Sequence, residues 1–121
     1  MNNPQSGRNG EETAVRLLQQ NGYRVIARNV RAKFGEIDVV AKDGEVLCFI
    51  EVKLRRSVRM GWPEEGVTRA KQRQLTRLAS WYLQAHRLRE VLVRFDVVSV
   101  FLAADGGPAR TRLIKGAFEA V

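Results

Sequence analysis

Two apolar segments joined by a tight turn constrain the fold of this 121-residue chain more than any other feature. The segments span residues 36–41 and 46–53, and each is largely apolar. The dipeptide Asp43-Gly44 between them is a strong signal for a two-residue hairpin loop. We therefore expect an antiparallel pair of strands whose side chains alternate between the two faces of a sheet.

This turn fixes which residues face each other across the hairpin. With the turn centred on the dipeptide, Asp38 lies opposite Phe49 and Glu36 lies opposite Glu51. One face of the hairpin then carries Glu36, Asp38, Glu51 and Lys53, and the other carries Ile37, Val39, Ala41, Val46, Cys48, Ile50 and Val52. All four charged side chains of the two segments fall on one face and none falls on the other, which supports this register independently of the turn. A three-residue turn would remove that separation.

The polar face brings two carboxylates close to one ammonium group. Asp38 and Glu51 become diagonal neighbours about 7–8 Å apart at the backbone, so their side chains can converge on a shared ion. Ionised groups among apolar strands are costly unless they are paired or bound to a metal. Lys53 supplies one positive charge, and a divalent metal ion would supply the rest. Asp38 and Glu51 are therefore candidate metal ligands, with the carbonyl of Val52 as a third.

The composition is typical of one soluble globular domain. With 45% apolar and 28% charged residues, a chain of this length can build a single core. We expect residues 1–8 to form a disordered tail and residues 9–121 to form the domain. No apolar run approaches membrane-spanning length, so no membrane segment is expected. One cysteine excludes an internal disulfide and favours a reducing, cytoplasmic setting.

Net charge and the scarcity of cysteine and histidine restrict the chemistry further. A net charge of +8 and a pI near 10.6 favour a polyanionic partner. With only Cys48 and His86, one chain cannot assemble a Cys/His zinc cluster. Cys48 is expected to be a buried, inert thiol and His86 a surface residue. Any catalysis must therefore depend on carboxylates, lysine and hard metal ions.

Hydrophobic periodicity predicts the remaining elements. The expected order is a helix over 9–20, strands over 23–29, 36–41 and 46–53, a helix over 68–88, and strands over 91–101 and 112–114. A polar loop over 55–66 precedes the second helix. This order predicts an α/β fold with a mixed central sheet flanked by helices. The crossover through the second helix should place the fourth strand parallel to the third.

Basic side chains gather on the second predicted helix and after the third predicted strand. The candidate nucleic-acid contacts are Arg55, Arg56, Arg69, Lys71, Arg73 and Arg77. The three arginines of the helix recur at i+4 spacing, so they form one ridge that either binds phosphates or is a solvated charged face. Lys71 lies on the inward side of this helix, and we expect it to point towards the acidic cluster.

Three further residues have two possible roles each. Glu11 lies in the first turn of the first predicted helix, where the helix dipole favours a carboxylate whatever its function. Trp62 either stacks on a base or folds back onto the domain. Asp96 is an isolated acid in a strand, and we expect it to pair with Arg94 or with another arginine.

Several segments together resemble a known family. They are Gly10-Glu11-Glu12, Gly22-Tyr23, Arg28-Asn29, Gly35-Glu36-Ile37-Asp38, Glu51-Val52-Lys53, Lys71, Arg94-Phe95-Asp96 and Gly116-Ala117-Phe118. The hairpin motifs resemble the active site of PD-(D/E)XK nucleases. The chain from Arg8 to Phe118 resembles the YraN family of bacterial proteins, which is related to archaeal-type Holliday junction resolvases. One departure is Ile37, which stands where the superfamily has proline before the aspartate.

The resemblance implies a restriction-endonuclease-like αβββαβ core and a metal site. In nucleases of that superfamily, the residues that match Asp38 and Glu51 hold Mg²⁺, and Mn²⁺ is the expected substitute. The residue that matches Lys53 positions or activates water, and an acid of the first helix assists, which is the role implied for Glu11. These four residues are the candidate catalytic set.

Three hypotheses about function follow. The first is a Mg²⁺-dependent endodeoxyribonuclease that acts on branched DNA, with a homodimer as a possible form because resolvases act as dimers. The second is a nucleic-acid-binding module that keeps the nuclease fold without catalysis. The third is a basic structural protein whose acids only pair with its many arginines. Retention of Asp38, Glu51 and Lys53 together argues against the third.

Overall fold

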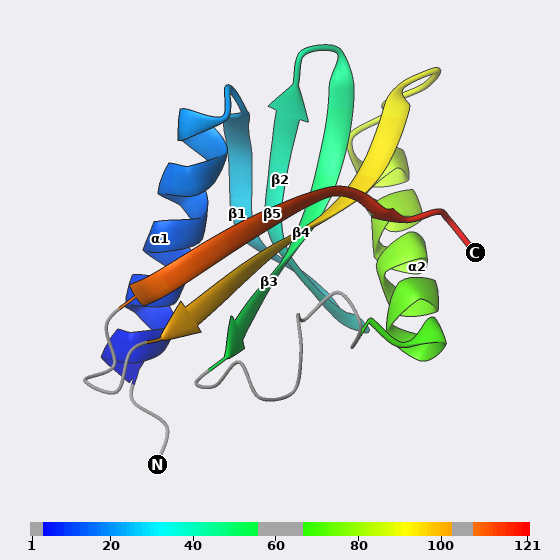
Figure 1. Ribbon diagram of the computed structural model, residues 1–121. Helices are drawn as coiled ribbons and strands as arrows, with labels where there is room; N and C mark the ends of the chain where they lie inside the picture. The colour runs from blue at the N-terminus through cyan, green and yellow to red at the C-terminus, as the bar shows by residue number, and fades with distance from the viewer. Residues whose placement is uncertain (1–3, 56–66, 103–107) are drawn as a thin grey trace.

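The computed structural model describes residues 4–55, 67–102 and 108–121. In chain order the elements are α1 (Pro4–Gln20), β1 (Arg24–Ala32), β2 (Gly35–Asp43), β3 (Val46–Arg55), α2 (Arg69–Ala85), β4 (Leu92–Leu102) and β5 (Pro108–Phe118), as Figure 1 shows. The strands form one sheet in the order β1-β2-β3-β4-β5. The predicted α/β class and element order are confirmed, and they are consistent with a restriction-endonuclease-like core.

The sheet is mixed, as expected. Strand β4 runs parallel to β3, because the chain crosses over through α2, while the other neighbouring pairs are antiparallel. Strands β1 and β5 are the two edges. Helix α1 begins at Pro4, earlier than the predicted Asn9, and β5 is much longer than the predicted 112–114. None of the described helices is long and apolar enough to cross a membrane.

Each helix covers one face of the sheet, which produces two core clusters (Figure 1). The α1-side core consists of Ala14, Val15, Leu18, Tyr23, Val39, Ala41, Cys48, Ile50, Val98, Val100 and Leu102. The α2-side core consists of Ile37, Val40, Leu47, Phe49, Leu75, Leu78, Ala79, Tyr82 and Phe95. Because strands β3 and β4 are buried on both faces, their sequences are apolar in near-continuous runs rather than in alternation.

The hairpin loop lies one residue later than predicted. Strand β2 ends at Asp43, β3 begins at Val46, and Gly44 adopts a positive φ of 61° in the loop between them. The ladder therefore pairs Val40 with Phe49, so the predicted Asp38–Phe49 and Glu36–Glu51 pairs are wrong. The register differs by two positions, and a shift of two leaves every side chain on the same face.

One face assignment fails as well. Six of the seven side chains predicted for the apolar face pack in or against the α1-side core, but Ile37 packs in the α2-side core. The β2–β3 ladder pairs residues only from Val39 and Ile50 onwards to the loop. Ile37 lies beyond this last pair, where strict alternation relative to β3 no longer holds. The end of the ladder is also where the acidic residues meet.

Candidate active site

Asp38 lies one residue beyond the end of the β2–β3 ladder. Its Oδ2 accepts a hydrogen bond of 2.8 Å from the backbone N–H of Val52, so the carboxylate continues the pairing with β3 where backbone pairing stops. Burial raises the pKa of Asp38, the Val52 hydrogen bond lowers it, and the negative charges of Glu51, Glu36 and Glu11 raise it, with a net value of about 6. Three neighbouring carboxylates therefore act against ionisation of Asp38.

Glu51 is largely buried and forms an ion pair with α2. Its side chain is 12% exposed, and its Oε1 lies 3.2 Å from the Nζ of Lys71 on α2. This ion pair confirms the prediction that Lys71 points towards the acidic cluster. The other oxygen, Oε2, is buried and has no hydrogen-bond partner. A buried carboxylate oxygen without a partner costs about 1–3 kcal/mol or more, so a ligand that reached it would gain that stabilisation.

Lys53 follows Glu51 by two residues and therefore extends on the same face of β3. Burial lowers its pKa, Glu51 raises it, and the positive charges of Arg55 and Lys71 lower it. In the parallel ladder Lys53 is the partner of Ser99, whose hydroxyl oxygen is buried without a hydrogen-bond partner. Ser99 was not predicted as a site residue, although it is the lone hydroxyl in the apolar run Val97–Phe101.

Glu11 reaches this region because α1 approaches β3 very closely. A Cβ on Gly10 would collide with the side chain of Leu54, so a larger residue at this position would require Leu54 to move. The next residue, Glu11, is partly buried, and its charge acts on Asp38. The structure therefore brings Glu11, Asp38, Glu51 and Lys53 into one region, while their shared catalytic role stays a prediction.

The carboxylate oxygens of Asp38 and Glu51 suit a hard divalent metal ion that takes only one or two ligands from the protein. Across the described ranges, no three side chains of Asp, Glu, His or Cys are grouped so that they could hold a metal ion. Mg²⁺ is usually bound by one or two carboxylates and keeps several waters. Asp38 and Glu51 meet this requirement, and the unpartnered Oε2 of Glu51 offers a free donor atom.

The predicted nucleic-acid contacts have mixed environments. Arg55 is exposed at the end of β3, and Arg69 and Arg73 are exposed on α2. Arg77 is also exposed, but its guanidinium lies 4.5 Å from the centroid of the Phe34 ring. Arg56 and Trp62 lie outside the described residues.

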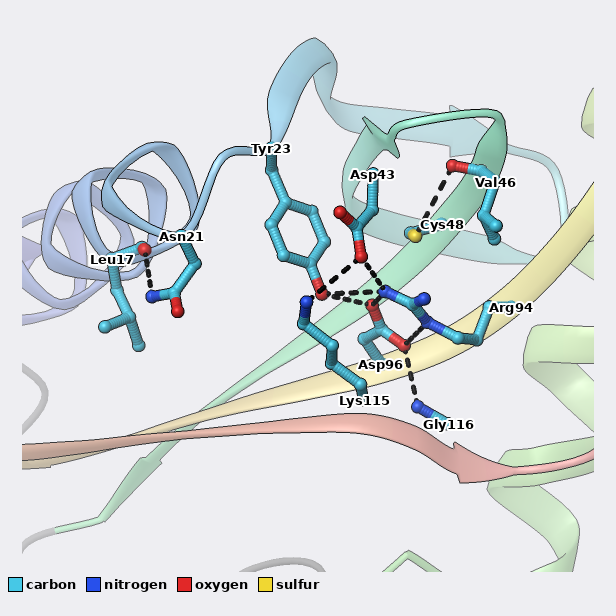
Figure 2. Close-up of polar contacts among 10 residues, drawn as sticks. All are labelled: Leu17, Asn21, Tyr23, Asp43, Val46, Cys48, Arg94, Asp96, Lys115 and Gly116. Carbon is cyan, nitrogen blue, oxygen red and sulfur yellow. Dashed lines mark hydrogen bonds and ion pairs between the residues drawn. The ribbon is translucent and has the colours of Figure 1, made fainter.

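A second charged cluster lies around Arg94 and is structural (Figure 2). The carboxylate of Asp96, which is 1% exposed, accepts hydrogen bonds from Arg94, Tyr23 and the backbone N–H of Gly116 at 2.7–2.9 Å. Arg94 also donates to Asp43 at 2.8 Å. The predicted Asp96–Arg94 pair is confirmed, and every oxygen of Asp96 is engaged. This cluster connects β4, β5, the hairpin and the start of β1.

The two residues excluded from catalysis behave as expected. Cys48 is buried, and burial raises the pKa of its thiol to about 12, so a reactive thiolate is not formed at neutral pH. His86 is exposed at the end of α2, where its ring stacks on Tyr82 at 4.1 Å.

We expect Asp38→Asn to stabilise the metal-free protein at neutral pH. The folded-state pKa of Asp38, about 6, exceeds the value of about 4 in unfolded chains. The folded protein therefore loses stability as the pH rises through about 6, because ionised Asp38 is disfavoured. Removing that charge should add on the order of 2 kcal/mol at pH 7.5 and nothing near pH 4.

Urea unfolding in EDTA at both pH values measures this effect. Asp43→Asn is the matched control with the opposite sign, because hydrogen bonds from Arg94 and Lys115 lower the pKa of Asp43. That variant should be less stable than the wild type at pH 7.5. A lower stability of Asp38→Asn at pH 7.5 would contradict the burial of an ionised carboxylate at this site.

Comparison with known proteins gives a consistent family assignment. The model of the uncharacterised protein family UPF0102 matches residues 10–100. A UPF0102 protein from Symbiobacterium thermophilum is 54% identical over 114 residues, which cover 94% of this chain and 96% of that protein. One from Caldicellulosiruptor saccharolyticus is 42% identical over 118 residues, which cover 98% of this chain and all of that protein. The chain therefore matches these relatives over nearly their whole length.

Proposed function

We propose that this chain, which belongs to protein family UPF0102, is a metal-dependent nuclease that hydrolyses phosphodiester bonds of DNA, branched DNA included. This family is the YraN family that the sequence motifs indicated. The observation that carries the proposal is the pair of carboxylates at the end of the β2–β3 ladder. Asp38 has a raised pKa and Glu51 has a buried oxygen without a partner, and both features favour a cation between them.

The residues of the site have distinct roles in this proposal. Asp38, Glu51 and the carbonyl of Val52 would hold Mg²⁺ or Mn²⁺. The ion, when bound, supplies charge neutralisation at the phosphate and a more acidic water. Lys53, held in a partly buried position beside Glu51, orients the attacking water or offsets negative charge. Glu11 adds a carboxylate from α1 that can order water at the same point.

Lys71 has a separate role in the proposed site. Its ion pair with Glu51 neutralises a carboxylate that is otherwise costly to bury. The ammonium group can turn to a phosphate when a metal ion replaces it beside Glu51, because the Lys71 side chain is 36% exposed. Lys71 is thus proposed to exchange between Glu51 and the nucleic acid.

The exposed arginines are proposed to hold the nucleic-acid backbone. Arg55 at the end of β3 and Arg69 and Arg73 on α2 lie on elements that also carry Glu51 and Lys71. Contacts from arginine to phosphate position a nucleic acid without reading its sequence. The net charge of +8 supports such binding.

A second candidate function is nucleic-acid binding without catalysis. The observation that favours it is the Lys71–Glu51 ion pair, because the ammonium group already neutralises one oxygen of the Glu51 carboxylate without a metal ion. In that case the acids would have no catalytic role and the basic side chains alone would be functional. The two candidates differ in one measurable property, which is cleavage.

Cleavage assays on defined DNA distinguish the two candidates. Labelled four-way junctions, flaps, single strands and blunt duplexes should be incubated with Mg²⁺, Mn²⁺ or EDTA. We expect products from at least one branched substrate with either metal and none in EDTA. If the protein binds these DNAs but cleaves none of them, nor the matching RNAs, the non-catalytic candidate is correct.

A further inference from the structure

A pocket outside the acidic cluster lies where the β1–β2 turn meets α2. It has a volume of about 620 Å³ and is lined by Arg31, Ala32, Lys33, Phe34 and Trp81. This volume lies within the range of small-ligand sites, about 300–1,000 Å³. Phe34 and Trp81 are half-buried at the edge of the α2-side core, so each ring is anchored but still partly accessible.

The side of the pocket formed by the turn is fixed in place by α2. The side-chain amide of Gln74 donates a hydrogen bond of 3.1 Å to the carbonyl of Phe34. One helical turn later, the guanidinium of Arg77 lies over the Phe34 ring at 4.5 Å. Figure 1 shows the turn between β1 and β2 beside α2. The aromatic ring is thus held by the fold and does not depend on a ligand for its position.

The charges around the pocket favour an anionic ligand. Arg31 and Lys33 line it and are exposed, and Arg77 lies against Phe34. One carboxylate offsets part of this positive charge, since Oε2 of Glu36 lies 3.6 Å from Nε of Arg31. Three cations against one anion, placed around two aromatic rings, match a nucleotide, because its base stacks and its phosphates carry negative charge.

Helix α2 connects this pocket with the acidic cluster. Lys71 pairs with Glu51, and Trp81 lines the pocket ten residues later on the same helix. Ten residues of helix span about 15 Å at 1.5 Å per residue. That length corresponds to roughly four stacked nucleotides at about 3.4 Å each. A single strand that enters the acidic cluster can therefore reach the pocket within a few nucleotides.

We propose that the Phe34–Trp81 pocket binds an unpaired nucleobase a few nucleotides away from the acidic cluster. A paired base in a duplex is stacked on both faces and cannot enter such a pocket without unpairing. The pocket therefore selects DNA with single-stranded segments, such as flaps or open junctions. This pocket adds a substrate preference to the proposed nuclease function, and its role in cleavage rests on that proposed function.

Binding measured in EDTA tests the pocket without any cleavage. Fluorescence anisotropy should compare a labelled single-stranded 20-mer with the blunt duplex of the same sequence. We expect Phe34→Leu and Trp81→Leu each to weaken single-strand binding by about tenfold, because a stacking platform is lost. Duplex binding should change less than about twofold. Phe34→Tyr keeps an aromatic ring and should bind as the wild type does.

A second measurement avoids any change in the pocket. Trp62→Phe leaves Trp81 as the sole tryptophan of the chain. Saturation with the unlabelled single strand should quench Trp81 emission strongly, and the duplex should quench it much less. Unchanged single-strand binding in both leucine variants, equal losses for the two DNAs, or no quenching would each overturn the proposal. Failure of the cleavage assays with normal quenching would instead overturn only the nuclease function.

Discussion

Asp38→Asn and Glu51→Gln are expected to lower the rate of metal-dependent DNA cleavage by roughly 100-fold or more each. Either change removes one of the two carboxylates proposed to bind the ion, and the charge stabilisation from a bound metal is worth several kcal/mol in the transition state. Both replacements keep the shape of the side chain. Single-turnover cleavage of a branched DNA in Mg²⁺ and in Mn²⁺ measures the effect.

Two controls separate this loss from a loss of folding or of DNA binding. Glu12→Gln also removes one negative charge, but its carboxylate pairs with Arg28 on the surface, so cleavage should change little. DNA affinity of Asp38→Asn in EDTA should equal or exceed that of the wild type, because a negative charge is removed near a polyanion. Cleavage by Asp38→Asn within about threefold of the wild type would exclude Asp38 as a metal ligand.

Asp96→Asn is expected to destabilise the fold by about 3–5 kcal/mol, the usual cost of breaking a buried ion pair. The carboxylate is 1% exposed and accepts hydrogen bonds from the side chains of Arg94 and Tyr23 and from the N–H of Gly116. The NH₂ group of an asparagine would face groups that themselves donate hydrogen bonds. The positive charge of Arg94 would also lose its buried carboxylate partner. Chemical denaturation at pH 7 measures the loss.

The matched control is an ion pair of equal length at the surface. Arg28 and Glu12 approach to 2.8 Å, as Arg94 and Asp96 do, but their side chains are 34% and 44% exposed. Glu12→Gln should therefore cost less than about 1 kcal/mol, as exposed pairs usually do. An equal cost for the two variants would show that burial does not determine the contribution of the Asp96 cluster.

The elements were predictable because their hydrophobic patterns are local. Helix α2 buries Leu75, Leu78, Ala79 and Tyr82, which recur at helical spacing in the sequence. The hairpin register was wrong by two positions, because Asp43-Gly44 and Gly44-Glu45 are both plausible loops and sequence alone does not separate them. Glu51 and Lys53 still share a face of β3, since strand alternation repeats every two residues, whereas Asp38 lies beyond the last β2–β3 pair.

Long-range features could not be derived from the sequence. Gly116 donates its N–H to Asp96, and Lys115 pairs with Asp43, across separations of 20 and 72 residues. The polar strand β5 carries little hydrophobic alternation and was therefore predicted too short. The Phe34–Trp81 pocket was also missed, because its two rings come from a turn and a helix that meet only in the folded chain.

Binding of Mn²⁺ to the purified protein tests the central claim most directly. Electron paramagnetic resonance follows the loss of free Mn²⁺ signal, with and without a single-stranded oligonucleotide present. We predict binding of at least one ion per chain that weakens below about pH 6, where protons compete for Asp38. Asp38→Asn and Glu51→Gln should each abolish it, and Glu12→Gln should not. Absence of bound Mn²⁺ at pH 7.5 with DNA present, or equal binding by all these variants, would contradict a metal site between Asp38 and Glu51.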